Sequence, residues 1–303
     1  MAGLGPAIHV FLLHARRGPA TSAGMTETVM LQVSDTAASA AVTEPETASP
    51  LLPRRYLRTF AGVISVIAGL LLWELVSRLF VANPLFLAAP SQILQAIYAL
   101  TESGEMQRHI AISAVEFALG YVIASVIGIV LGFAMAESVA AKRALQPWIS
   151  GLYATPTIAL APLFILWLGI GIWSKVLVVI FLVLFPVTIN TEAGLRTTSE
   201  RLIEMLRSFG ASPRQIFFKV SVPSAMPFIL AGLKLGIGRG LIGVVVAELF
   251  GSRAGLGRLI SQSADAFNMP DLFAGVVVLA FAGIVLTAGF TWLEGKLVPW
   301  TKD

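Results

Sequence analysis

Long apolar stretches separated by short polar or basic segments make up the sequence from residue 60 onward. A helix needs about 20 mostly apolar residues to cross a bilayer, and six stretches reach roughly that length. These stretches are residues 60–80, 114–136, 149–168, 172–189, 228–250 and 272–293. The third contains Pro156 and Pro162, which predict a local irregularity. The pattern predicts an all-α membrane protein with six transmembrane helices.

The segment 191–227, between the fourth and fifth stretches, carries helix signals of its own. It is too long for a simple hairpin and too amphipathic for a random linker. The run SPRQ at residues 212–215 begins with a capping hydroxyl, has proline at the first helical position and ends in a glutamine that can close a capping box. Gly210 suits a left-handed turn that ends a preceding helix. These signals predict helix, tight corner, helix, although by themselves they fit an ordinary solvated connector better than a docking surface.

Two further segments lie outside the predicted spans. Residues 87–100, with Pro90 before an apolar-periodic run, predict an amphipathic helix along the outer surface. Residues 1–53 form a tail that is rich in Ala, Thr, Ser, Glu and Pro over much of its length and is expected to be disordered and cytoplasmic. The transmembrane domain is therefore predicted to comprise residues 54–303.

Small residues spaced four apart mark two of the predicted spans. They are Ala124, Gly128 and Gly132 in the second span, and Gly232, Gly236 and Gly240 in the fifth. Such stripes let helix backbones approach closely, so that van der Waals packing drives their association. Packing within one bundle is the simpler interpretation, and a subunit interface is the alternative.

The composition agrees with a membrane protein. Of the 303 residues, 56% are hydrophobic and 13% are charged, whereas soluble domains carry about 25% charged residues. The absence of cysteine excludes disulfide frameworks and thiolate metal sites. Two of the three histidines, His9 and His14, lie in the N-terminal tail, which argues against a metal cluster with His109. We therefore expect neither a metal site nor a cofactor site in this chain.

The basic residues between the apolar stretches predict the orientation. One set of loops holds Arg54, Arg55, Arg58, Lys142, Arg143, Arg196, Arg201, Arg207, Arg214, Lys219, Lys296 and Lys302. The opposite loops hold Arg108, Lys175, Arg253 and Arg258. Cytoplasmic loops carry an excess of Lys and Arg, so both termini are predicted to be cytoplasmic. This asymmetry explains the net charge of +4 more simply than binding to nucleic acid does.

Arg239 is the charged residue that lies deepest in a predicted span. It stands about eleven residues into the fifth stretch, or roughly 16 Å along a helix that rises 1.5 Å per residue, which is too deep for easy snorkelling. A guanidinium attracts oxyanions, so we assign Arg239 to the translocation path, with a structural ion pair as the alternative. Pro156, Thr157 and Glu248 are further candidates for the path, although anchoring is the simpler role for Glu248. Glu116 is expected at the membrane interface.

The loop before the fifth stretch resembles the EAA loop of binding-protein-dependent ABC importer permeases. That loop has a glutamate, a glycine six residues later, and an ending of two aliphatic residues, separated by one residue, with proline after the second. These places are filled by Glu204, Gly210, Val220, Val222 and Pro223. The departures are Met205 and Leu206, where the family favours alanine, and Val222, where leucine is usual. The resemblance implies that residues 204–212 form the coupling helix, seated in a groove of an ATPase.

The resemblance extends over most of residues 55–300. The runs LYATPTIALAPLFILWLGIG, FPVTINTEAGLR and GVVVAELFGSRAGLG are similar to the nitrate, sulfonate and taurine branch of these permeases. It implies the type I importer fold and a bacterial inner-membrane location. The residues that it assigns to coupling with the ATPase are Glu204, Arg207, Gly210, Ala211, Ser212 and Pro223.

The same resemblance implies the partners. They are a second permease copy, forming a homodimer, two ATPase subunits on the cytoplasmic face and a solute-binding protein outside. The chain is then not an enzyme: ATP is bound by the partner subunit, and no GxxxxGK[ST] run occurs in this sequence. The implied cargo is a small anion of the aliphatic sulfonate, taurine or nitrate class. The alternative is a secondary transporter without an ATPase, which would need ion-coupling residues and inverted repeats.

Overall fold

The computed structural model describes residues 54–79 and 86–299, with side chains from residue 62 onward. The chain divides into two compact units, Met1–Val63 and Ile64–Asp303, and the helices that position the site belong to the second. The predicted tail 1–53 lies outside the described residues.

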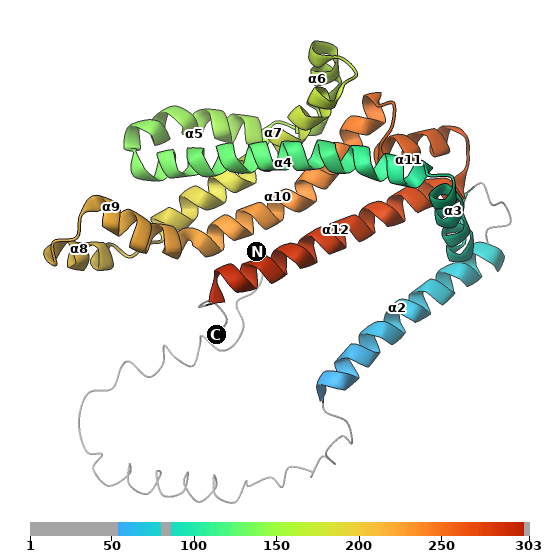
Figure 1. The fold of residues 1–303 in the computed structure, drawn as a ribbon, viewed down its shortest axis with the longest axis horizontal. Helices are drawn as coiled ribbons and strands as arrows, with labels where there is room; N and C mark the ends of the chain where they lie inside the picture. The colour runs from blue at the N-terminus through green and yellow to red at the C-terminus, as the bar shows by residue number, and fades with distance from the viewer. Residues whose placement is uncertain (1–53, 80–85, 300–303) are drawn as a thin grey trace, which may run out of the picture. The chain divides into compact units, whose positions relative to one another are not determined.

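The described residues are helical, with short connections and no strand among them (Figure 1). In chain order, the α-helices are α2 (Arg54–Leu79), α3 (Pro90–Glu102), α4 (Glu105–Glu137), α5 (Val139–Ala154), α6 (Ala161–Leu168), α7 (Ile172–Arg196), α8 (Glu200–Ser208), α9 (Pro213–Ile216), α10 (Val222–Gly251), α11 (Leu256–Asp265) and α12 (Met269–Leu297). A 3₁₀ turn, Thr157–Leu160, precedes α6, and a π-helical turn, Phe217–Ser221, joins α9 to α10.

Five helical segments of the described chain are long and apolar enough to cross a membrane. They lie in α2, α4, α7, the continuous run Pro213–Gly251, and α12. A sixth span results when α5 is counted together with the segment Thr157–Leu168. With this bent pair counted as one span, the structure has the six spans that the apolar pattern predicts.

The third predicted span, 149–168, is irregular as its prolines predict, but its predicted start is wrong. Its first half begins earlier, at Val139, and the two halves meet at an angle of 85°. The break falls at Thr155 and Pro156, whose backbones leave the helical region. The physical reason is that proline disfavours the helical conformation in the residue before it.

The boundaries of the segment 191–227 are also corrected. Helix α7 continues to Arg196, and α10 begins at Val222 rather than near residue 228. Pro223 lies in the first turn of α10, directly after the π-helical turn, and Pro227 lies inside the helix. The helix continues through Pro227 because the flanking residues, Ala225 and Ile229, are buried against α7, and this packing outweighs one lost hydrogen bond.

The core of the bundle lies between α4, α7 and α10, which run side by side in Figure 1. Its central cluster consists of Phe117, Ala124, Val179, Val183, Val187, Ile237 and Val244. Val179, Val183 and Val187, spaced four apart, are fully buried on α7, because that helix packs against α4 on one side and α10 on the other.

The small residues spaced four apart on α4 and α10 pack against α7 within this bundle. This agrees with the simpler of the two interpretations of the sequence. A Cβ built on Gly132 of α4 would lie 2.5 Å from the Cβ of Thr191 and 2.9 Å from the carbonyl oxygen of Thr188, both on α7. On α10, a Cβ at Gly232 would lie 2.8 Å from the Cβ of Asn190. Glycine is needed at these places because the neighbouring backbone occupies the space of a side chain.

Gly132→Val is expected to lower the thermal stability of the purified protein. The added side chain has to push α4 away from α7, and overpacking of this kind costs about 1–3 kcal/mol. Thermal unfolding of the permease in detergent measures the effect. Gly151→Val is the matched control, because a Cβ at Gly151 of α5 meets open space. Equal thermal unfolding midpoints for Gly132→Val and Gly151→Val would contradict the close contact of α4 with α7.

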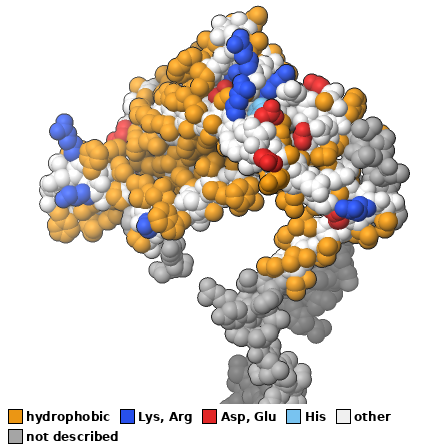
Figure 2. Space-filling view, turned by 45° about the vertical axis from the view of Figure 1, so that its right-hand side comes forward, with side chains coloured by type: hydrophobic (Ala, Val, Ile, Leu, Met, Phe, Trp, Pro, Cys, Tyr) orange, Lys and Arg blue, Asp and Glu red, His pale blue; other side chains and the backbone are white. Residues whose placement is uncertain are grey.

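Much of the apolar surface faces outward, as expected for helices surrounded by lipid. Figure 2 shows broad hydrophobic areas, and among the exposed side chains are Leu71, Leu166, Phe281 and Ile284. The predicted amphipathic helix is present as α3. Its inner face joins a cluster with α11 and α12, whereas Leu94 and Tyr98 stay exposed.

Candidate functional site

Helix α8 and its C-terminal corner form an exposed amphipathic surface between α7 and α10. None of the nine residues of α8 is buried. Its apolar side chains include Leu202 and Met205, which are exposed, and Phe209, just after the helix, is 80% exposed. Glu204 and Arg207 are exposed on the same helix. An exposed surface of this kind, apolar with charges beside it, is typical of a protein-binding site.

The corner is held by backbone hydrogen bonds. Gly210 has φ of +81°, the left-handed conformation that its position predicts. Its N–H donates to the Arg207 carbonyl at 2.9 Å, and the N–H of Ala211 donates to the Leu206 carbonyl at 3.0 Å. This pair of bonds is a Schellman motif, which ends a helix in a fixed direction.

The next helix begins with the predicted capping box. The Ser212 hydroxyl accepts from the N–H of Gln215 at 3.3 Å, and the Gln215 side chain accepts from the N–H of Ser212 at 2.8 Å. Both ends of the corner are thus determined by local chemistry, and this part of the prediction is confirmed.

The corner is also attached firmly to the bundle. Phe217, in the π-helical turn, packs against Phe133 of α4 with ring centroids 5.6 Å apart. Leu195, Ala225 and Ile229 are buried beside it. Between α8 and α9 lies a shallow hollow of about 360 Å³, whose lining includes Phe209. Helix α8 itself has no buried residue, so a force applied to it reaches the bundle along the chain through α9 and the packed side chain of Phe217.

A buried charge cluster lies between α4, α7 and α10. Glu116, expected at the membrane interface, is only 2% exposed and lies inside the bundle. The carboxylate of Glu116 lies 3.7 Å from the ammonium of Lys175, which is also buried. Sequence reasoning missed this pair because Glu116 and Lys175 are far apart along the chain and each lies near the end of an apolar stretch.

Glu248 completes the cluster and is fully buried. It accepts from the Ser113 hydroxyl at 2.6 Å and from the N–H of Gly257 at 2.6 Å. Ser113 in turn accepts from the N–H of Leu256 at 2.8 Å. These bonds tie the segment between α10 and α11 to α4, so the position of Glu248 favours anchoring over lining a path.

Arg239 lies on the exposed surface of α10 and contacts α5. Its guanidinium donates to the Tyr153 hydroxyl at 3.0 Å and lies 5.2 Å from the centre of that ring. Pro156 follows this tyrosine at the break after α5, and Thr157 is buried there. The structure thus brings Arg239 to the bent third span, whereas the hydrogen bonds of Glu248 connect it to α4 and the segment after α10.

Residues 124–303 match the family described as "Binding-protein-dependent transport system inner membrane component". The chain therefore belongs to this family and is a multi-pass permease subunit of an ABC importer, not an enzyme. It is 35% identical to the formylaminopyrimidine transport permease protein ThiX of Halalkalibacterium halodurans, over 77% of this chain and 92% of the relative. It is 33% identical to the taurine transport system permease protein TauC of Escherichia coli, over 79% and 88% of the two chains.

A solved structure confirms the fold. "Crystal structure of an amino acid ABC transporter with histidines" matches with a TM-score of 0.53 at 16% identity, covering 67% of this chain and 96% of that chain. The predicted family and the type I importer fold are therefore confirmed. Nothing in these comparisons supports a secondary transporter.

Proposed function

We propose that this permease imports a small aliphatic sulfonate, such as taurine, or a related anion such as nitrate. The similarity to a taurine permease supports this cargo class, and the exposed guanidinium of Arg239 is a suitable transient partner for a sulfonate. The similarity to a formylaminopyrimidine permease makes an uncharged pyrimidine the second candidate cargo.

The observation that carries the proposed mechanism is the exposed apolar surface of a rigid corner. Leu202, Met205 and Phe209 present apolar surface, and Glu204 and Arg207 lie among them. We assign this surface, from Glu204 to Ser212, to a groove of a separate ATPase, with Pro223 at the start of α10 connecting it to the bundle.

The proposed assembly is a permease homodimer with two ATPase subunits and one solute-binding protein. The ATPases bind the ATP, so this chain holds no cofactor. The excess of basic residues places α8, α9 and both termini on the cytoplasmic side of a bacterial inner membrane, and the binding protein on the outer side. ATP binding draws the docked corners together, and the bundles alternate between inward and outward access.

Reconstitution tests this function. Proteoliposomes containing the permease, its ATPase and its binding protein are expected to take up labelled taurine when ATP is inside. Uptake of formylaminopyrimidine in place of taurine would identify the second candidate cargo. Uptake by the permease alone, without nucleotide, would overturn the proposed coupling.

Arg239→Ala is expected to reduce uptake by about tenfold, which corresponds to about 1.4 kcal/mol of lost stabilisation in the rate-limiting step. The reason is that the variant removes a cation that attracts the anionic cargo. The ATPase should still co-purify, and basal ATP hydrolysis should stay normal. Tyr153→Phe is the control, since it removes one hydrogen bond but keeps the guanidinium. Loss of the assembled complex in Arg239→Ala would show a structural role instead.

A further inference from the structure

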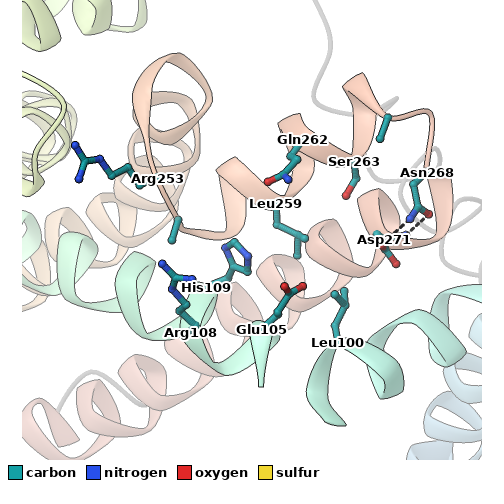
Figure 3. Close-up of a pocket in the computed structure, with 12 residues that line it drawn as sticks. Leu100, Glu105, Arg108, His109, Arg253, Leu259, Gln262, Ser263, Asn268 and Asp271 are labelled. Atoms are coloured by element: carbon teal, nitrogen blue, oxygen red, sulfur yellow. Dashed lines mark hydrogen bonds between the residues drawn. The ribbon is translucent and has the colours of Figure 1, made fainter. Parts of the chain in front are cut away.

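A polar pocket lies at the end of the bundle opposite α8 and α9. It has a volume of about 410 Å³ and is lined by the end of α3, the start of α4, the segment before α11, α11 itself and the start of α12 (Figure 3). Pockets that hold small molecules range from about 300 to 1,000 Å³, so the size suits a compact ligand.

The basic side chains of this pocket lie toward one side of it and the acidic side chains toward the other. Figure 3 shows the guanidinium groups of Arg108 and Arg253 toward the left, with Glu105 nearer the centre and Asp271 farther to the right. Glu105 and Asp271 lie close enough to repel each other electrostatically. A ligand with an anionic end and a cationic end could therefore contact the arginines with the first and the carboxylates with the second.

These charged groups have little compensation within the protein. Among the described residues, Arg108, Arg253 and Glu105 make no salt bridge, and the Asp271 carboxylate accepts one hydrogen bond, from the Asn268 amide. Ser263, only 6% exposed, also lines the pocket, and no hydrogen bond of its hydroxyl is found in the described part of the chain. The two arginines and Glu105 are exposed to solvent, so these charges and the Ser263 hydroxyl are available to a polar molecule that enters the cavity.

The frame of the pocket is rigid. The ring Nδ1 of His109 lies 2.8 Å from the carbonyl oxygen of Gly255 and 2.9 Å from its nitrogen. Leu256 is fixed to Ser113, and the Asn268 amide donates to the Asp271 carboxylate at 2.6 Å. Preorganised polar groups of this kind lose little entropy when a ligand binds.

We propose that this pocket binds a small zwitterion, an aminoalkyl sulfonate, with the sulfonate at Arg108 and Arg253 and the ammonium at Glu105 and Asp271. Guanidinium groups suit sulfonate oxygens because they present several N–H donors in one plane. A simple anion would be repelled by the two carboxylates, and a simple cation by the two arginines. The proposal rests on the proposed function, because it makes the pocket a site on the outer face that receives the cargo before transport.

Direct binding to the full-length permease in lipid nanodiscs tests the proposal. Ligand-observed NMR titrations would compare taurine, ethanesulfonate and ethylamine. Taurine is expected to bind about tenfold more tightly than either single-charge analogue, since each analogue leaves one charged group of the pocket unpaired. The variant Arg108→Gln/Arg253→Gln is expected to weaken taurine binding by about tenfold, and Glu105→Gln to abolish the preference for taurine over ethanesulfonate.

Two changes on α11 serve as matched controls. Arg258→Gln and Asp265→Asn remove the same charges from residues that do not line the pocket, and both should bind taurine like the unmodified protein. Equal affinity for taurine and ethanesulfonate, or unchanged binding in the double arginine variant, would overturn the proposal. So would a loss of binding in either control.

Transport measurements separate this proposal from the proposed function. ATP-driven taurine uptake by the complete importer, without taurine binding to the isolated permease, would remove the pocket as a cargo site and leave the function intact. Taurine binding that depends on the pocket residues, without sulfonate uptake, would support the pocket and overturn the proposed transport. Binding of the solute-binding protein that is lost in the double arginine variant, without binding of taurine to the permease alone, would mean that the pocket receives that protein instead.

Discussion

Gly210→Val is expected to abolish ATP-driven uptake while the permease still folds and inserts. Gly210 has φ of +81° at the corner between α8 and α9. A β-branched residue there costs about 1–3 kcal/mol of backbone strain, which the corner relieves by changing its direction. Helix α8 would then present Phe209 and Glu204 to the ATPase at the wrong angle. Uptake in proteoliposomes and ATPase co-purification measure the result.

Two further variants make this test specific. Gly210→Asn should retain most of the uptake, because asparagine tolerates the left-handed conformation. Gly169→Val imposes backbone strain that is at least as large, at φ of +76° and ψ of 179°, with equally open space around the new Cβ, but it lies outside the corner. Its uptake should stay close to that of the unmodified protein. Full uptake by Gly210→Val would mean that the corner does not couple ATP hydrolysis to transport.

Glu248→Ala is expected to cause the largest loss of stability. The change leaves the buried Lys175 beside a single carboxylate, that of Glu116, and takes away the acceptor of Ser113 and of the Gly257 N–H. Each buried donor left without an acceptor costs about 1–3 kcal/mol, and the cavity left by the missing side chain adds to the loss. Thermal unfolding in detergent and the yield of folded protein from membranes measure this effect.

Glu248→Gln distinguishes hydrogen bonding from charge. The amide keeps the shape but has one acceptor oxygen where the carboxylate has two, so one of the two contacts has to form with the NH₂ group as donor, and an intermediate unfolding midpoint is expected. Glu137→Ala, at the end of α4 and away from this cluster, should unfold like the parent protein. If Glu248→Ala unfolds at the same temperature as the unmodified protein, the carboxylate does not anchor the segment between α10 and α11.

The corner illustrates what local sequence signals can predict. Gly210 and residues 212–215 act through hydrogen bonds to groups within five positions, so a single short run contains all the required chemistry. The apolar stretches are equally local, since their length alone matches a bilayer. The predicted starts of the third and fifth spans were wrong because proline residues and tertiary packing have opposite effects on whether a helix continues.

The charged residues illustrate the opposite case. Glu116, Lys175 and Glu248 each stand near the end of an apolar stretch, where an interfacial position is the simplest interpretation. Only the packing of α4, α7 and α10 brings them into one dry cluster. The polar pocket at the start of α4 likewise combines side chains from segments that are more than a hundred residues apart, such as Arg108 and Arg253.

The amino-acid sequence by itself determined the class of this protein, its number of spans, its family and the helix–corner–helix form of the segment before α10. These features depend on hydrophobic length, on capping chemistry and on a short motif, all of which act between residues that are close along the chain. The tertiary structure decided which charges are buried together, where α5 and α6 bend apart, and which side chains share a pocket. These features depend on contacts between distant segments, which periodicity and composition do not encode.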